Sequence, residues 1–322
     1  MGQMKGKASI EFEHPPVIIS AGAVVGKKEG DGPLGQLFDQ VEQDDMFGKD
    51  NWEQAESAMQ KRTADLVIEK GGIRKGDLRY LFAGDLLGQL IATSFGTVDL
   101  EIPLFGLYGA CSTMGEALSL GAMAVNGGYA NQVMSMASSH FATAEKQFRF
   151  PLAYGNQRPM SATWTVTGCG TVVIAGDRKN GLARIAGITT GRTVDMGAKD
   201  SMNMGAAMAP AAFHTIEQNL EDFQVNETWY DKIITGDLGY YGTQLTRELL
   251  EKEGFLLDER YTDCGIQIYD KEAQDTHGGG SGCGCSAVTM AGYLLSEIQK
   301  GAFHRVLLIP TGALLSPLST QQ

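Results

Sequence analysis

The sequence predicts a layered α/β fold made of two similar halves, and two observations support this prediction. Both halves read in the same order: strand, helix, strand, helix, loop, apolar helix and strand. When Cys111 is aligned with Cys285, Gly128 falls within one residue of Gly301, at the turn that follows each apolar helix. The repeat is too long for a solenoid. Two halves rich in strand–helix–strand units predict two sheets with the two apolar helices packed between them.

The first half is expected to span residues 1–180. Runs of apolar and β-branched residues predict strands, and apolar residues spaced three or four apart predict helices. On these grounds we expect strands at 16–25, 78–83, 132–137 and 163–175, and helices at 52–69, about 86–95 and from Cys111 onward. A long polar and aromatic connection, residues 138–162, lies between the last two strands. A loop of this length is typical of a cover over a functional site.

The second half is expected to span residues 181–322. The same patterns predict strands at 182–190, 231–235 and 307–311, and helices at 204–220, 244–253 and 288–298. The Gly-Asp-Leu turn at 84–86 recurs at 236–238, which is a further sign of duplication. No counterpart of the strand at 163–175 follows residue 311. We therefore expect the final strand of this half to be missing.

Charge and cysteine content exclude several classes of function. The chain has 26 basic and 38 acidic residues, a net charge of −12, which argues against nucleic acid or a bare anionic membrane as partner. The N-terminus lacks the apolar core of a signal peptide, and no run approaches the ~18 apolar residues of a membrane span, so we expect synthesis in the cytosol. The odd number of cysteines, five, favours reduced thiols. The spacing of Cys283 and Cys285 does not fit a zinc site, and we expect no metal centre.

The motif with the clearest chemical meaning is the turn before the first apolar helix. Cys111 follows Gly109-Ala110 and is expected on the first turn of a helix in which Glu116 is the only charge. Unpaired backbone amides and the helix dipole at that position favour a thiolate. The turn therefore suggests covalent chemistry or the capture of an anion, and a buried, inert cysteine is the alternative.

These motifs give the chain a recognisable resemblance. Gly109-Ala-Cys111-Ser before a buried helix, within duplicated halves, resembles the thiolase superfamily of condensing enzymes, whose fold is a five-layer α-β-α-β-α sandwich. More closely, nearly the whole chain resembles the stage V sporulation protein AD family of spore-forming bacilli and clostridia. The stretches that carry this resemblance are residues 107–118, 157–168, 235–239 and 277–287.

The closer resemblance implies a function and a place in the cell. It implies a protein that binds dipicolinic acid (pyridine-2,6-dicarboxylate), free or as its calcium chelate, for dipicolinate uptake into developing spores and its release in germination. It implies no cofactor, with calcium entering only as part of the chelate. The implied partners are the other stage V A sporulation proteins at the spore inner membrane, where the protein would be peripheral. It also implies a homodimer, which we expect to form through an edge strand at 132–137.

The loops that should complete a condensing enzyme lack the expected residues. In the superfamily, a histidine and an asparagine, or a histidine and a second cysteine, assist the reactive thiol. The loop after Thr235 offers Asp237 and no histidine, and the second loop offers Cys283 or Cys285 in place of asparagine. We therefore expect a protein that is not an enzyme. If acyl transfer is retained, Cys111 would be its nucleophile and His277 its base.

A flat dicarboxylate ligand calls for backbone amides, an aromatic or glycine wall and a basic side chain. His277 is weighed as a pocket residue against a surface histidine. Asp85 and Asp237 are weighed as ligands of calcium in the chelate against ordinary turn aspartates. The candidate ligand-binding residues are Cys111, Asp85, Asp237, His277, Gly279, Ser281, Cys283, Arg149 and Arg158.

Three hypotheses follow from the sequence. The preferred one is a dipicolinate-binding protein without catalytic activity. The second is an acyl transferase of the thiolase or ketoacyl synthase type that uses Cys111. The third is a structural platform for a spore membrane complex.

Overall fold

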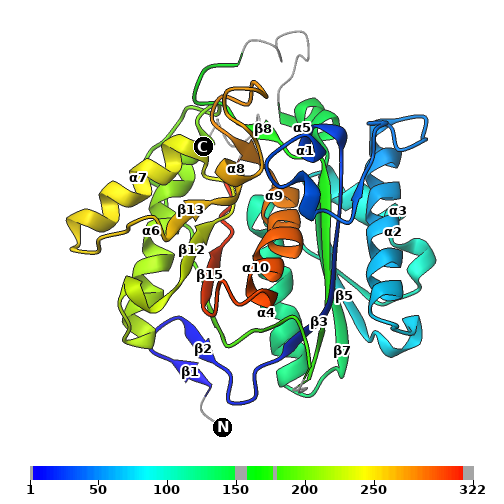
Figure 1. Ribbon diagram of the computed structural model, residues 1–322, viewed down its shortest axis with the longest axis horizontal. Helices are drawn as coiled ribbons and strands as arrows, with labels where there is room; N and C mark the ends of the chain where they lie inside the picture. Colours follow the sequence, from blue (N-terminus) through cyan, green and yellow to red (C-terminus); the bar gives the residue numbers. More distant parts are fainter. Residues whose placement is uncertain (1–2, 149–157, 177–179, 315–322) are drawn as a thin grey trace.

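The computed structural model describes residues 3–148, 158–176 and 180–314, and within them the chain forms five layers. Figure 1 shows them from one side to the other: helices α6 and α7, a small sheet, the buried helices α4 and α9–α10, a large sheet, and helices α2 and α3. This order confirms the layered α/β prediction. Among the described residues, no helix combines the length and the hydropathy needed to cross a bilayer.

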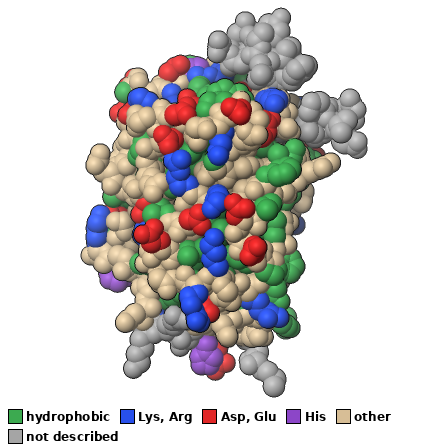
Figure 2. Space-filling model, turned by 90° about the vertical axis from the view of Figure 1, so that its right-hand side faces the viewer, with side chains coloured by type: hydrophobic (Ala, Val, Ile, Leu, Met, Phe, Trp, Pro, Cys, Tyr) green, Lys and Arg blue, Asp and Glu red, His purple; other side chains and the backbone are tan. Residues whose placement is uncertain are grey.

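The large sheet has seven strands, in the order β10-β3-β9-β7-β5-β6 with β4 paired to β3. The two central pairs, β3–β9 and β9–β7, are antiparallel, whereas β7, β5 and β6 run parallel. The strands are β3 (Val17–Val25), β4 (Gln40–Val41), β5 (Tyr80–Gly84), β6 (Leu104–Gly106), β7 (Gln132–Ser139), β9 (Gly168–Ala175) and β10 (Ala183–Arg184). The outer face is covered by α2 (Trp52–Lys70) and α3 (Ile91–Gly96). On the face of the molecule that carries α2, acidic and basic side chains are interspersed (Figure 2).

The small sheet contains β13 (Tyr261–Asp263), β12 (Lys232–Thr235) and β15 (Val306–Ile309), all parallel. Helices α6 (Met204–Phe223) and α7 (Gly239–Lys252) pack beside it. The prediction of one continuous strand at 182–190 is wrong, and no part of this segment belongs to the small sheet. The segment divides into β10, which joins the large sheet, and β11 (Gly187–Thr189), which pairs with β2 (Ser9–Glu11) and through it with β1 (Met4–Lys5). The predicted absence of a final strand concerns residues that lie partly outside the described ranges.

The two buried helices differ in regularity. Helix α4 (Thr113–Asn126) is continuous, and a 3-10 turn at Ala110–Ser112 precedes it. Its counterpart begins as α9 (Cys283–Val288), widens into one π-helical stretch over Thr289–Leu294 and ends as α10 (Leu295–Gln299). The predicted helix at 288–298 therefore starts five residues earlier, and Cys111 lies just before its helix instead of on the first helical turn.

The strand predicted as the dimer edge is not an edge. β7, which contains residues 132–137, lies between β5 and β9 in the middle of the large sheet. Residues 104–106 form the true edge strand, β6, because the chain crosses over through α3 and pairs beyond β5. Its three residues are exposed, Phe105 by half.

Close backbone packing joins α9 to the large sheet. A Cβ atom on Gly170, in the middle of β9, would lie 2.3 Å from the carbonyl of Ala287 on α9. Only glycine permits this approach.

The predicted strand at 163–175 is interrupted. Residues 164–165 form β8, which pairs with β14 (Gly280–Ser281) of the second half. The connection at 138–162 begins with the end of β7 and α5 (Phe141–Phe148), and residues 149–157 lie outside the described ranges.

A buried carboxyl group also ties the two halves together. Glu29, on the short helix α1 (Lys27–Gly30), accepts hydrogen bonds from the hydroxyl of Tyr269 and, at 2.9 Å, from the backbone amide of Thr167. Burial raises the pKa of Glu29 from 4.5 to about 7, against the effect of these hydrogen bonds.

This shift makes stability depend on pH. Between pH 4.5 and about 7 the folded chain holds a proton on Glu29 that the unfolded chain has lost, so the free energy of unfolding falls as the pH rises through this window. The contribution of one group is at most about 1.4 kcal/mol per pH unit. Glu29→Gln removes it, so urea unfolding between about pH 5 and pH 8 should show a flatter profile than wild type. The exposed control Glu251→Gln should follow wild type, and parallel profiles for Glu29→Gln would refute the assignment.

Candidate functional site

The turn that carries Cys111 is held by its own side chains. Ala110 has a positive φ of 51°, and Thr113 Oγ1 donates a 2.7 Å hydrogen bond to the carbonyl of Ala110. Ser112 Oγ bonds to the carbonyl of Gly109 at 2.7 Å and to Glu116 at 2.6 Å. These bonds fix the orientation of Cys111, whose side chain is buried.

Asp237 is the principal polar partner of this thiol. It follows β12, is buried, and accepts a 2.8 Å hydrogen bond at Oδ2 from the amide of Gly282. Burial raises the pKa of Asp237 to about 7. Burial and the charge of Asp237 together raise the pKa of the Cys111 thiol well above its usual value. The expectation of a stabilised thiolate is therefore wrong, because the thiol is buried and the second half places a carboxyl group beside it.

A second carboxyl group, which the sequence reasoning missed, positions Asp237. Asp263 ends β13 and accepts hydrogen bonds at Oδ2 from Thr235 Oγ1 (2.7 Å) and from the amide of Leu238 (2.8 Å). Its Oδ1 accepts from the amides of Gly239 (3.0 Å) and Gly265 (2.9 Å). Asp263 thus organises the loop that presents Asp237. Its position as the last residue of a short strand is visible in the sequence, but its contacts with Leu238 and Gly239 come only from the tertiary structure.

The glycine-rich run from Gly278 to Gly284 approaches the same centre from the other side. Gly282 has a φ of 97°, and a Cβ atom there would lie 2.6 Å from Ser139 Oγ. The thiol of Cys283 donates to the carbonyl of Ser138 at 2.9 Å, and burial raises its pKa well above the usual value. Cys283 is therefore a buried neighbour of the site and not a second reactive thiol.

Two candidate ligand-binding residues, Gly279 and Ser281, lie in the same run. Ser281 belongs to β14, and Gly279 immediately precedes that strand. Gly279 accepts a 2.8 Å hydrogen bond from the amide of Trp164. Ser281 pairs with Thr165, and its carbonyl accepts from the amide of Val166. Its hydroxyl is buried and has no hydrogen-bond partner in the described part of the chain.

Asp85 does not play the same part as Asp237 although both lie in Gly-Asp-Leu turns. Its Oδ1 accepts from the amide of Leu87 and its Oδ2 from the amide of Thr93, both at 2.7 Å. These bonds favour the interpretation as a turn aspartate. Within the described ranges, no group of three or more His, Cys, Asp and Glu side chains is arranged to hold a metal ion.

A buried glutamate, also missed from the sequence, is coupled to Asp85. Glu56, on α2, accepts 2.8 Å hydrogen bonds from the hydroxyls of Ser138 and Thr143. Burial and the negative charge of Asp85 raise the pKa of Glu56, and burial raises the pKa of Asp85. The pair is thereby driven to keep a proton beside the glycine-rich run.

His277 directly precedes Gly278, the first residue of the glycine-rich run, and this end of the run is here called its outer end. Its Nδ1 bonds to the carbonyl of Pro159 at 3.0 Å and its Nε2 pairs with Asp275 at 3.0 Å. Both ring nitrogens are occupied, so His277 is not arranged to take a proton from Cys111. Arg158 lies at the same outer end and also pairs with Asp275. Arg149 lies outside the described residues.

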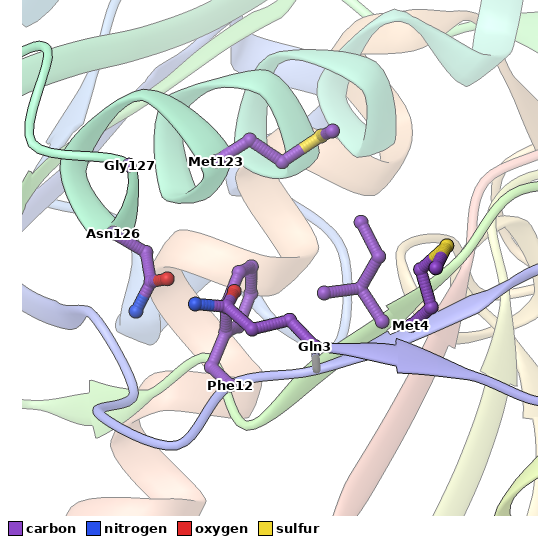
Figure 3. A pocket seen from close by; sticks show the side chains of 7 residues that line it. Gln3, Met4, Phe12, Met123, Asn126 and Gly127 are labelled. Atoms are coloured by element: carbon purple, nitrogen blue, oxygen red, sulfur yellow. The ribbon is translucent and has the colours of Figure 1, made fainter. Parts of the chain in front are cut away.

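A shallow surface pocket lies elsewhere, between the N-terminal strands and the end of α4 (Figure 3). It is lined by Gln3, Met4, Ile10, Phe12, Met123, Asn126 and Gly127. Cys111 precedes the opposite end of this helix, so the length of α4, about 20 Å, separates the two places. The pocket is not part of the cysteine centre.

Removal of the Asp237 charge is expected to lower the pKa of the Cys111 thiol. In Asp237→Asn, the pH midpoint for alkylation of Cys111 by iodoacetamide, followed by peptide mass spectrometry, should fall by about one unit or more. The exposed control Asp99→Asn should leave it unchanged. Cys169, whose buried thiol has a pKa of about 12, serves in the same digest as a reference for accidental unfolding. An unchanged midpoint in Asp237→Asn would contradict the role given to this carboxyl group.

Comparison with solved structures places this centre in a known fold. The chain is similar to 3-oxoacyl-[acyl-carrier-protein] synthase III from Aquifex aeolicus VF5, with a TM-score of 0.55 and 16% identity over 91% of this chain and 94% of that one. It is also similar to human mitochondrial 3-ketoacyl-CoA thiolase in complex with CoA, with a TM-score of 0.59 and 11% identity over 93% and 95% of the two chains. At these identities the likeness shows the fold, which is thiolase-like.

Sequence comparison is more specific. The family described as Stage V sporulation protein AD matches residues 6–322. Stage V sporulation protein AD of Bacillus subtilis (strain 168) is 40% identical over 320 residues, which cover 99% of this chain and 94% of that protein. The chain therefore belongs to the stage V sporulation protein AD family, and its fold is that of the thiolases.

Proposed function

We propose that this sporulation-family protein binds dipicolinate, free or as its calcium chelate, and does not transfer acyl groups. The observation that carries the proposal is the pair formed by Cys111 and Asp237. A carboxyl group that raises the pKa of the thiol suppresses the nucleophile that acyl transfer needs. His277, the candidate base, is engaged elsewhere.

Asp237 suits an anionic ligand when its carboxyl group carries a proton. Its pKa of about 7 keeps part of the population protonated at neutral pH, and a protonated carboxyl group is a hydrogen-bond donor. Apart from the thiol of Cys111, which bonds to the Asp237 carboxyl group, the buried atoms Asp237 Oδ1 and Ser281 Oγ have no hydrogen-bond partner among the described residues. Buried polar atoms without partners are costly and call for a partner from outside the chain.

The wider role follows from the family. We propose that ligand binding serves dipicolinate uptake into developing spores and its release in germination. In this role the protein would be peripheral at the spore inner membrane, together with the other stage V A sporulation proteins. Membership of the sporulation family supports this part of the proposal.

Calorimetric titration with dipicolinate, with and without calcium, tests the proposal. Wild type should bind saturably, and incubation with acetyl-coenzyme A should leave the mass of Cys111 peptides unchanged. Binding should weaken above about pH 7 as Asp237 loses its proton. Asp237→Asn, whose amide always donates, should retain binding and lose this pH dependence. Asp237→Ala should weaken binding at least about tenfold.

One control variant and two possible outcomes separate this proposal from its rivals. Cys111→Ala should still bind dipicolinate, because the thiol has no chemical part in holding the ligand. Acylation of Cys111 in wild type would favour the acyl transferase. Neither binding nor acylation would leave a structural platform as the surviving hypothesis.

We also propose that the chain forms a homodimer through β6 in place of the interior strand 132–137. β6 exposes an unpaired strand edge, and Phe105 stacks on Phe82 at 5.1 Å while half of its surface stays exposed. An edge of this kind can continue its sheet by pairing with a second copy of itself. Other large exposed apolar side chains near it in sequence are Phe95, Val98, Leu104 and Tyr108.

Phe105→Glu is therefore expected to yield monomers. The negative charge of one copy would face that of its partner across the two-fold axis. Light scattering after size exclusion measures the mass, and circular dichroism checks the fold. Leu256→Glu, at an exposed apolar position in the second half, is the matched control and should remain dimeric. A monomeric wild type, or a dimeric Phe105→Glu, would contradict the proposal.

A further inference from the structure

Two cations share one aromatic ring at the outer end of the glycine-rich run. The Nζ atom of Lys28 lies 4.5 Å from the ring centroid of Trp164, and the guanidinium carbon of Arg158 lies 4.8 Å from the same centroid. Phe141 stacks on Trp164 at 5.6 Å and 20°. The indole is thereby fixed, and cation–π attraction holds both positive groups beside it.

The positive charges are incompletely neutralised. Lys28 Nζ donates to a backbone carbonyl, that of Gln274, at 2.6 Å. Arg158 reaches Asp275 only at 3.4 Å, and the carboxylate of Asp275 is 80% exposed. Burial lowers the pKa of Lys28 and the charge of Arg158 lowers it further, whereas the charges of Glu29 and Asp275 oppose this. The two cations therefore repel each other, and the carboxylate that acts on both of them, that of Asp275, is largely exposed to solvent.

One donor at this place has no acceptor. The Arg158 side chain is only 8% exposed, and its Nη2 bonds to the carbonyl of Asp275 at 3.0 Å. Its Nη1 is buried and has no hydrogen-bond partner within residues 3–148, 158–176 and 180–314. A guanidinium has five N–H donors in a planar fork that matches a carboxylate or a phosphate. A buried, unsatisfied donor of a charged group costs more than a neutral one, which indicates that an acceptor belongs there.

The glycine-rich run connects two places: the two-cation site, formed by Lys28 and Arg158 beside Trp164, and the cysteine centre, formed by Cys111 and Asp237. Trp164 pairs with Gly280 in the two-stranded β8–β14 sheet. Two residues further along, Gly282 donates its amide to Asp237. Two extended residues span about 7 Å. Figure 1 shows α1, β8 and α8 (Cys264–Gln267) together at the end of the molecule from which α9 runs down toward α10.

We propose that Lys28 and Arg158, held against Trp164, form an anion-binding site for a carboxylate group, and that this site receives one carboxylate of the dipicolinate ligand. This inference rests on the proposed function for the identity of the ligand. The existence of an anion site rests on the two cations and on the buried Nη1 atom alone. Inorganic phosphate offers the same chemistry from a different source, so it serves as the second probe.

Calorimetry on the full-length chain tests the site with dipicolinate, pyridine-2-carboxylate and inorganic phosphate. Wild type should prefer dipicolinate to the monocarboxylate. Arg158→Gln and Lys28→Gln should each weaken dipicolinate binding about ten- to a hundredfold, which corresponds to the loss of a hydrogen bond to a charged group. They should also lose most of the preference for two carboxylates over one, and Arg158→Lys should restore part of it.

Lys27→Gln is the matched control. Lys27 neighbours Lys28 on α1, but it is exposed and already paired with Asp31. It should bind dipicolinate as wild type does. Thermal unfolding of each variant distinguishes loss of the site from loss of the fold, because a folded Arg158→Gln chain with weakened binding supports the proposal.

The remaining outcomes decide between this inference and the proposed function. Dipicolinate binding that is equal in wild type, Arg158→Gln and Lys28→Gln would overturn the two-cation site and leave the proposed function intact. Phosphate binding that depends on Arg158, without dipicolinate binding, would support the anion site and overturn the proposed ligand. Binding of neither probe by wild type would overturn both.

Discussion

The glycine-rich run at 278–284 passes closer to its neighbours than side chains would allow. Cβ atoms on Gly278 and Gly284 would lie 2.7 Å from the carbonyl of Ser161 and 2.5 Å from that of Gly168. The run therefore packs backbone against backbone on the first half of the chain. It also contributes the amide that fixes Asp237 and begins the helix α9. The halves, the small β8–β14 sheet and the cysteine centre all depend on this close approach.

Acidic groups, buried and kept partly protonated, surround this approach. Asp237, Asp263, Glu56 and Asp85 all have raised pKa values, with burial as the largest cause. A negative and desolvated environment opposes formation of a thiolate at Cys111. Thiolase-like enzymes and this chain share a fold, but the fold by itself does not give the thiol its reactivity. Burial of the thiol and the carboxyl group that the second half places beside it determine that reactivity.

Charge is distributed unequally along the run. Lys28 and Arg158 lie beside its outer end, whereas Asp237 binds the amide of Gly282 near its inner end. The protein as a whole has a net charge of −12, so long-range attraction of a dicarboxylate is not expected. An anion would have to be held by short contacts, which Arg158 Nη1 and a protonated Asp237 are able to supply.

The sequence by itself determined the layered fold, the strands at 16–25, 78–83 and 132–137 and the burial of the helix after Cys111. Hydrophobic periodicity and glycine turns are local signals, and they were sufficient for this. Only the tertiary structure decided that β7 is interior, that residues 183–184 join the first sheet, that Asp263 and Glu56 belong to the site and that the Cys111 thiol stays neutral. Each of these depends on contacts between residues far apart in the chain, which no local pattern encodes.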